Sequence, residues 1–75
     1  MKFHEIIKEL REDRTPKINQ LELGEIFHWT QSKISRMETG RAEPSLEDLR
    51  TLCRFYNVSA DYLLGLPDDL PYPKQ

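Results

Sequence analysis

The apolar positions near the start of the chain recur with the spacing of an amphipathic α-helix. They are three and four residues apart, with charged residues between them: Phe3, Ile6, Ile7 and Leu10. This spacing places the apolar side chains on one face of a helix. We expect the helix to end at Thr15-Pro16, because the residue before a proline is disfavoured in the α-helical conformation.

Two further short helices are predicted on either side of His28-Trp29. Asn19 and Thr30 are good N-caps, because their side-chain oxygens can accept a hydrogen bond from the first helical turn. The residues expected to face inward are Leu23, Ile26 and Phe27 in one helix and Ile34 and Met37 in the next. The second of these helices is expected to end near Glu38, because Gly40 can adopt the left-handed backbone conformation that often follows a helix.

A fourth and a fifth helix follow. Ser45 and Asp48 have the spacing of a capping box, which predicts a helix start. The apolar residues on one face of the fourth helix are Leu46, Leu49, Leu52, Cys53 and Tyr56. Asn57 suits the left-handed position after this helix, Ser59 can cap a short fifth helix, and Gly65 ends it.

The last ten residues, LPDDLPYPKQ, contain three prolines, so this tail is expected to be extended. No stretch alternates between apolar and polar residues as a strand does. A chain of 75 residues allows one domain. We therefore predict an all-α domain of five helices over residues 1–66 and a Pro-rich, acidic tail over residues 67–75.

Composition and charge narrow the possible functions. No apolar run approaches the roughly 20 residues of a membrane-spanning helix, so no membrane partner is expected. The single cysteine excludes an internal disulfide and fits a cytoplasmic protein. The net charge is −2, yet residues 14–41 hold five basic and three acidic residues, a net +2. A field this weak can steer a polyanion only through a few local contacts.

Residues that could support catalysis or bind a metal are few. His4 and His28 have no ligand partner three or four residues further on, so no metal site is expected. Cys53 lies on an apolar stripe without an evident histidine partner. Asp68-Asp69 lies in the tail, where no cleft would desolvate the carboxylates. We predict that the chain is not an enzyme and needs no cofactor.

The order of residues from position 19 to position 64 is more specific. The informative positions are Asn19-Gln20, Gly24, Thr30, Ile34-Ser35-Arg36, Glu38, Gly40, Pro44-Ser45, Val58-Ser59, Asp61 and Leu63-Leu64. Together they resemble the phage-repressor family of Cro and cI type, and with the first helix the match covers residues 3–66. The resemblance implies a five-helix, lambda-repressor-like helix-turn-helix domain that binds double-stranded DNA.

The resemblance also implies roles for individual residues. The helix after the His28-Trp29 turn would enter the major groove and read bases through Gln31, Ser32 and Arg36. The Arg36 guanidinium matches guanine O6 and N7, and the Gln31 amide matches adenine N6 and N7. The residues implied at the DNA backbone are Gln20, Thr30, Lys33, Thr39, Arg41 and, in the link before the second helix, Lys17.

Some implied features concern structure alone. Arg11 and Glu38 match a family ion pair, which we interpret as holding the base-reading helix in orientation. The link RTPKI is longer than usual, and Leu21 is expected to pack beneath it. Gly24 stands where the family usually has Ala, and a side chain larger than one methyl group would separate the two crossing helices.

The turn between the second and third helices also departs from the family pattern. His28 stands where a glycine is usual, and histidine tolerates a left-handed conformation only moderately, so strain is expected there. Trp29 replaces a smaller aliphatic residue and has to find room in the core. The turn of this chain is therefore expected to be bulkier than the family's.

Apolar residues near the C-terminus have three interpretations. Leu66, Leu70 and Tyr72 fold back onto the domain, contact a second subunit, or lead into a further domain. Tyr62 is expected to join them if they form a dimer contact. The leading prediction is a small repressor that binds a palindromic operator as a homodimer and occludes a promoter. The alternative is a protein-binding module on the same fold, such as an antitoxin or an anti-repressor partner, which the net negative charge and the acidic tail favour.

Overall fold

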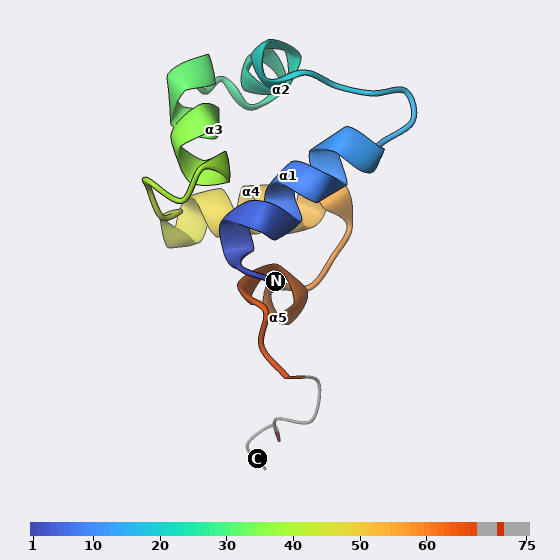
Figure 1. The fold of residues 1–75 in the computed structure, drawn as a ribbon, viewed down its shortest axis with the longest axis vertical. Coiled ribbons are helices and arrows are strands. Elements are labelled where there is room, and N and C mark those ends of the chain that lie inside the picture. Colours follow the sequence, from blue (N-terminus) through green and yellow to red (C-terminus); the bar gives the residue numbers. More distant parts are fainter. Residues whose placement is uncertain (68–70, 72–75) are drawn as a thin grey trace.

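The computed structural model describes residues 1–67 and residue 71. This part of the chain forms five helices: α1 (Phe3–Asp13), α2 (Gln20–Phe27), α3 (Gln31–Glu38), α4 (Leu46–Tyr56) and α5 (Ala60–Leu64). The same residues contain no strand. The prediction of an all-α, five-helix fold is confirmed (Figure 1).

Four helices begin at the residues expected to cap them. A side-chain oxygen accepts a hydrogen bond from the backbone N–H three residues further on at Asn19 (2.8 Å), Thr30 (3.1 Å), Ser45 (3.1 Å) and Ser59 (3.1 Å). These caps satisfy N–H groups that no helical carbonyl can reach. The starts of α2 to α5 are therefore set by local sequence.

Left-handed residues directly follow three of the helices, and Gly40 (φ 79°), two residues beyond the end of α3, is left-handed as expected. His28 (φ 60°) ends α2, Asn57 (φ 56°) ends α4 and Gly65 (φ 70°) ends α5. α1 ends at Asp13, just before the predicted stop at Thr15-Pro16. The connections between α2 and α3 and between α4 and α5 are consequently short, which brings consecutive helices close together.

An apolar core lies between the helices. Its buried members are Ile6, Ile7, Leu23, Ile34, Met37, Leu52 and Leu63. Ile26 and Leu46 were expected to face inward, but they are 50% and 74% exposed, so these two predictions are wrong. Leu46 is the first residue of α4, and Ile26 lies away from the side of α2 that Leu23 and Gly24 bury. The expectation for Leu21 is also wrong, because this residue is 55% exposed instead of packed beneath the link.

α2 and α3 lie side by side at one end of the domain, and α5 lies at the opposite end (Figure 1). α3 packs against α2 and α1, whereas α1 and α4 both pack against α5.

None of the described helices is both long enough and apolar enough to cross a membrane. Leu70 and Tyr72, two of the expected contact residues, lie outside the described residues.

Candidate nucleic-acid interface

The turn between α2 and α3 is tightly packed around Gly24. The Trp29 N–H donates to the Gly24 carbonyl at 2.8 Å, and His28 adopts the left-handed conformation that makes this contact possible. A Cβ atom added to Gly24 would lie 2.5 Å from the Trp29 carbonyl oxygen. The sequence-based expectation that one methyl group would fit is therefore wrong, because even that carbon overlaps the backbone of the turn.

Trp29 finds room by packing against neighbouring aromatic rings. Its ring centroid lies 4.7 Å from that of Phe27, and Phe27 in turn lies 5.0 Å from Phe55 in an edge-to-face arrangement. The Arg14 guanidinium lies 4.3 Å from the Phe55 ring centroid. These contacts connect the turn, α4 and the link before α2, and they hold the turn in place.

α3 has a buried side and an exposed side. Ile34 and Met37 are 3% and 2% exposed and attach the helix to the core. Gln31, Ser32 and Arg36 are exposed, and their side chains accept or donate no hydrogen bond and form no ion pair within residues 1–67. The helix therefore presents an amide, a hydroxyl and a guanidinium to an external partner.

The N-termini of α2 and α3 offer backbone donors. Asn19 caps the third N–H of α2 and Thr30 caps the third N–H of α3. The first two N–H groups of each helix precede these capped donors, and the helix dipole adds partial positive charge there. Two such helix starts favour an anion, as a DNA phosphate would be.

A buried ion pair connects α1 to the end of α3. Arg11 Nε and Nη2 donate to the two carboxylate oxygens of Glu38, each at 2.8 Å, and Arg11 Nη1 donates to the Ile18 carbonyl at 3.1 Å. The Glu38 side chain is 2% exposed. The hydrogen bond to Glu38 raises the pKa of the Arg11 guanidinium above its ordinary value. The pair therefore holds α1, α3 and the link together.

Gln20 belongs to the same network. Its Nε2 donates to Glu38 Oε1 at 3.1 Å, which orients the amide at the start of α2. One amide hydrogen is used in this contact and the second remains for another acceptor. The sequence suggested a phosphate ligand here, but no local signal indicated the bond to Glu38, which lies 18 positions away.

The other residues predicted at the DNA backbone differ in their surroundings. Lys17 and Arg41 are exposed on the link before α2 and on the segment after α3. The Thr39 hydroxyl donates to the Ser35 carbonyl at 2.9 Å and so closes the end of α3. Lys33 Nζ lies 3.1 Å from Asp48 Oδ1, a contact with α4 that sequence reasoning missed.

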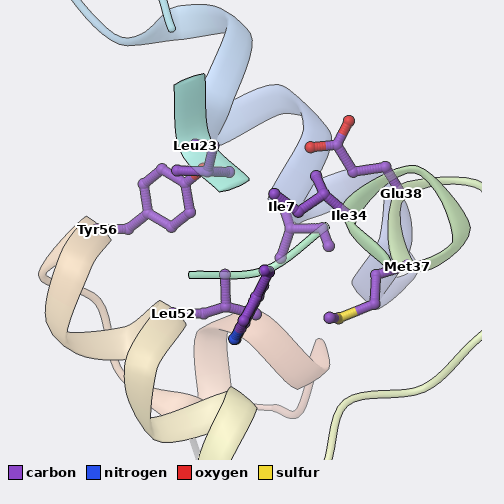
Figure 2. Close-up of a pocket in the computed structure, with 8 residues that line it drawn as sticks. Ile7, Leu23, Ile34, Met37, Glu38, Leu52 and Tyr56 are labelled. Carbon is purple, nitrogen blue, oxygen red and sulfur yellow. The ribbon is translucent and has the colours of Figure 1, made fainter. Parts of the chain in front are cut away.

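A small cavity of about 10 Å³ lies beneath α3 (Figure 2). Its lining includes Ile34, Glu38 and Tyr56, and its volume corresponds to about one water molecule. The Tyr56 hydroxyl is buried and has no hydrogen-bond partner among the described residues. Desolvation raises the Tyr56 pKa to about 12.

No group of His, Cys, Asp and Glu side chains in the described part of the chain could hold a metal ion.

Comparison with known proteins identifies the class. The family of the helix-turn-helix domain matches residues 6–69, so the chain belongs to that family. The chain is 31% identical over 65 residues to the HTH-type transcriptional activator BcrR of Enterococcus faecalis, covering 87% of this chain and 31% of that protein. It is 37% identical over 68 residues to the uncharacterized HTH-type transcriptional regulator YobD of Bacillus subtilis (strain 168), covering 91% of this chain and 58% of that protein. The chain thus spans less than two thirds of either relative.

Proposed function

We propose that this chain is a sequence-specific transcription regulator that binds double-stranded DNA through α3. The observation that carries the proposal is the exposed side of α3, where Gln31, Ser32 and Arg36 have no partner within residues 1–67. Membership of the helix-turn-helix family supports it, as do the names of the two relatives, a transcriptional activator and a transcriptional regulator.

The chemistry of the exposed residues assigns their roles. Arg36 donates in two-point fashion to guanine O6 and N7, Gln31 pairs with adenine, and Ser32 contacts a base edge or a phosphate. The groups proposed at the DNA backbone are Gln20, Lys17, Thr30, Thr39, Arg41 and the free N–H groups that begin α2 and α3. Gln20→Ala is expected to weaken binding evenly across sequences, because a phosphate contact carries no base information.

We further propose that the protein binds a palindromic operator as a homodimer. Tyr62 and Leu66 are 52% and 42% exposed near the C-terminal end of the domain, where they can contact a second copy. A dimer would place two α3 helices one turn of DNA apart. Occupying a promoter in this way gives repression. A reporter gene placed behind the operator measures the sign of regulation directly: repression lowers its expression and activation raises it.

The test is fluorescence anisotropy of the purified chain in a salt series. The two probes are a duplex enriched by this protein from a random-sequence pool and the same duplex scrambled. We expect a preference of about 10³-fold or more for the enriched duplex, and an affinity that falls with salt as counterions are released. Weak binding that is equal on both duplexes, even at low salt, would contradict the proposal.

A protein-binding module on the same fold is the second candidate. The exposed apolar residues at the α5 end favour it: Met1, Tyr62, Leu64 and Leu66. The two functions predict different locations for binding-defective substitutions. A DNA-binding regulator loses binding through Arg36→Ala on α3, whereas a module that captures a protein through the α5 end loses it through Tyr62→Ala.

A further inference from the structure

Lys33 is held by two groups outside its own helix. Its Nζ atom lies 3.1 Å from Asp48 Oδ1 and 4.2 Å from the centroid of the Trp29 ring. The Lys33 side chain is 39% exposed and that of Asp48 is 15% exposed, so the pair is partly shielded from water. An ammonium group that contacts both a carboxylate and an indole ring is restrained by two partners, whereas an isolated surface pair has only one restraint.

These two partners belong to different elements. Trp29 lies in the turn before α3, and Asp48 is part of the capping box of α4, where its Oδ2 accepts from the Ser45 N–H at 3.4 Å. Within residues 1–67, the bond from Lys33 to Asp48 is the only hydrogen bond between the side chains of α3 and α4. Lys33 thus connects α3 to both the turn and the start of α4.

The surroundings of Lys33 argue against a phosphate contact. To reach a phosphate, the ammonium would have to leave both Asp48 and the ring of Trp29, and the Asp48 carboxylate would then remain beside the DNA without its partner. Lys33 and Arg36 line the same shallow hollow as Asp48. A change in the orientation of α3 at Lys33 would therefore also move Arg36, the residue proposed to read guanine.

We propose that Lys33 is a positioning residue that fixes α3 against the turn and α4, and that it is not a phosphate ligand. The proposal rests on the proposed function in one respect: it matters for DNA binding only if α3 reads bases. Three substitutions test it. Lys33→Met and Asp48→Asn each remove one charge of the pair, and Lys33→Arg keeps the cation. Glu47→Gln is the matched control, because Glu47 precedes Asp48 in α4 and its side chain is 86% exposed.

The first measurement is the fluorescence of Trp29, the single tryptophan of the chain, in the absence of DNA. We expect Lys33→Met and Asp48→Asn to shift the emission in the same direction. Lys33→Met removes the ammonium from the indole ring, and Asp48→Asn removes the carboxylate that keeps the ammonium there. Lys33→Arg and Glu47→Gln are expected to leave the emission as in the wild type. Circular dichroism checks that each variant is folded at the temperature used. An unchanged emission in folded Lys33→Met and Asp48→Asn would overturn the proposal.

The second measurement is the ratio of affinities for the enriched and scrambled duplexes across a salt series. We expect Lys33→Met and Asp48→Asn each to lower this ratio about threefold to tenfold, with the salt slope unchanged and with the double variant no worse than either single one. A phosphate ligand predicts otherwise. If Lys33 were a phosphate ligand, Lys33→Met would reduce the salt slope by about one contact. Asp48→Asn would then strengthen binding to both duplexes. These two results would overturn the proposal.

The two measurements separate the failure of each proposal. If the wild-type chain prefers neither duplex, the proposed function fails. The emission of Trp29 then decides alone whether Lys33 holds α3. A common shift in the two charge-removing variants supports the link, and its absence overturns it.

Discussion

The Arg11 guanidinium meets the Glu38 carboxylate in a two-point contact, with both nitrogen–oxygen distances at 2.8 Å. The contact joins α1 to the last residue of α3, and Gln20 of α2 donates to the same carboxylate. Three helices are therefore held by one charged group that is almost fully buried. A buried pair of this kind is sensitive to the removal of one partner, because the other charge is left without compensation.

Glu38→Gln is expected to destabilise the fold. The substitution keeps the shape of the side chain but leaves the Arg11 charge without its counter-charge, at a cost of about 2–4 kcal/mol. Urea denaturation measures the free energy of unfolding. Glu47→Gln is the control, since the 3.9 Å pair of Glu47 with Arg50 is solvent-exposed and its loss should cost less than about 0.5 kcal/mol. Equal costs for the two substitutions would contradict the structural role of the buried pair.

Gly24→Ala is expected to destabilise the fold even though alanine favours helices. The added carbon would lie 2.5 Å from the Trp29 carbonyl oxygen, so α2 and the turn would have to move apart. Overpacking of this kind costs about 1–3 kcal/mol. Glu25→Ala, at the next and exposed position of α2, should change stability by less than about 0.5 kcal/mol. If Gly24→Ala were as stable as the wild type in thermal unfolding, the close approach would not exist in solution.

His28→Gly is expected to stabilise the fold. His28 has φ 60°, a left-handed conformation that costs an L-residue about 1–2 kcal/mol, and glycine adopts it freely at the cost of some extra entropy. The net gain should be about 0.5–1 kcal/mol in urea denaturation. Asn57→Gly changes the other left-handed cap with φ 56°, and its gain should be smaller because asparagine tolerates this conformation better. A loss of stability in His28→Gly would indicate an interaction of the imidazole that the conformational argument omits.

Ionisation of Tyr56 is expected to lower the free energy of unfolding at high pH. Burial raises its pKa from the ordinary 10.0 to about 12, so its hydroxyl stays protonated in the folded chain over a range where the unfolded chain ionises. The unfolded chain gains free energy by ionising this hydroxyl, and the folded chain does not until the pH reaches about 12. The stability of the fold is therefore unaffected by ionisation of Tyr56 below about pH 10 and falls as the pH rises from about 10 to 12. Tyr56→Phe should therefore show a shallower decline of stability across that range.

The same substitution has a second expected effect at pH 7. The hydroxyl has no hydrogen-bond partner among the described residues, so Tyr56→Phe should be as stable as the wild type or more stable. Urea denaturation at pH 7 and at intervals between pH 10 and 12 checks both effects. A loss above about 1 kcal/mol at pH 7 would mean that the hydroxyl is hydrogen-bonded in solution.

The helix starts could be predicted from sequence because they depend on neighbours along the chain. Asn19, Thr30, Ser45 and Ser59 each cap the N–H three residues further on, and this requires only the correct local spacing. The exposure of Ile26 was predicted wrongly because the buried side of a helix depends on contacts with other parts of the chain. In a helix as short as α2, apolar spacing leaves the direction of the buried side undetermined until α3 and the turn are in place.

Contacts between distant residues were only partly accessible. The Arg11–Glu38 pair was expected because the family resemblance implied it, whereas the donation of Gln20 to Glu38 had no signal in the sequence. The bond from Lys33 to Asp48 spans 15 positions and depends on how α3 meets α4. Charge spacing along one helix cannot reveal such a pair, because its geometry is set by tertiary packing.

The most direct test of base reading by α3 is the affinity of Arg36→Ala for a set of enriched duplexes that differ by one base pair each. We predict a loss of about 1–3 kcal/mol and relaxed discrimination at a single base pair. Arg54→Ala removes the same side chain from the exposed surface of α4 and should keep both affinity and discrimination. An Arg36→Ala profile that matches the wild type at every position would contradict the assignment of α3 as the helix that reads DNA.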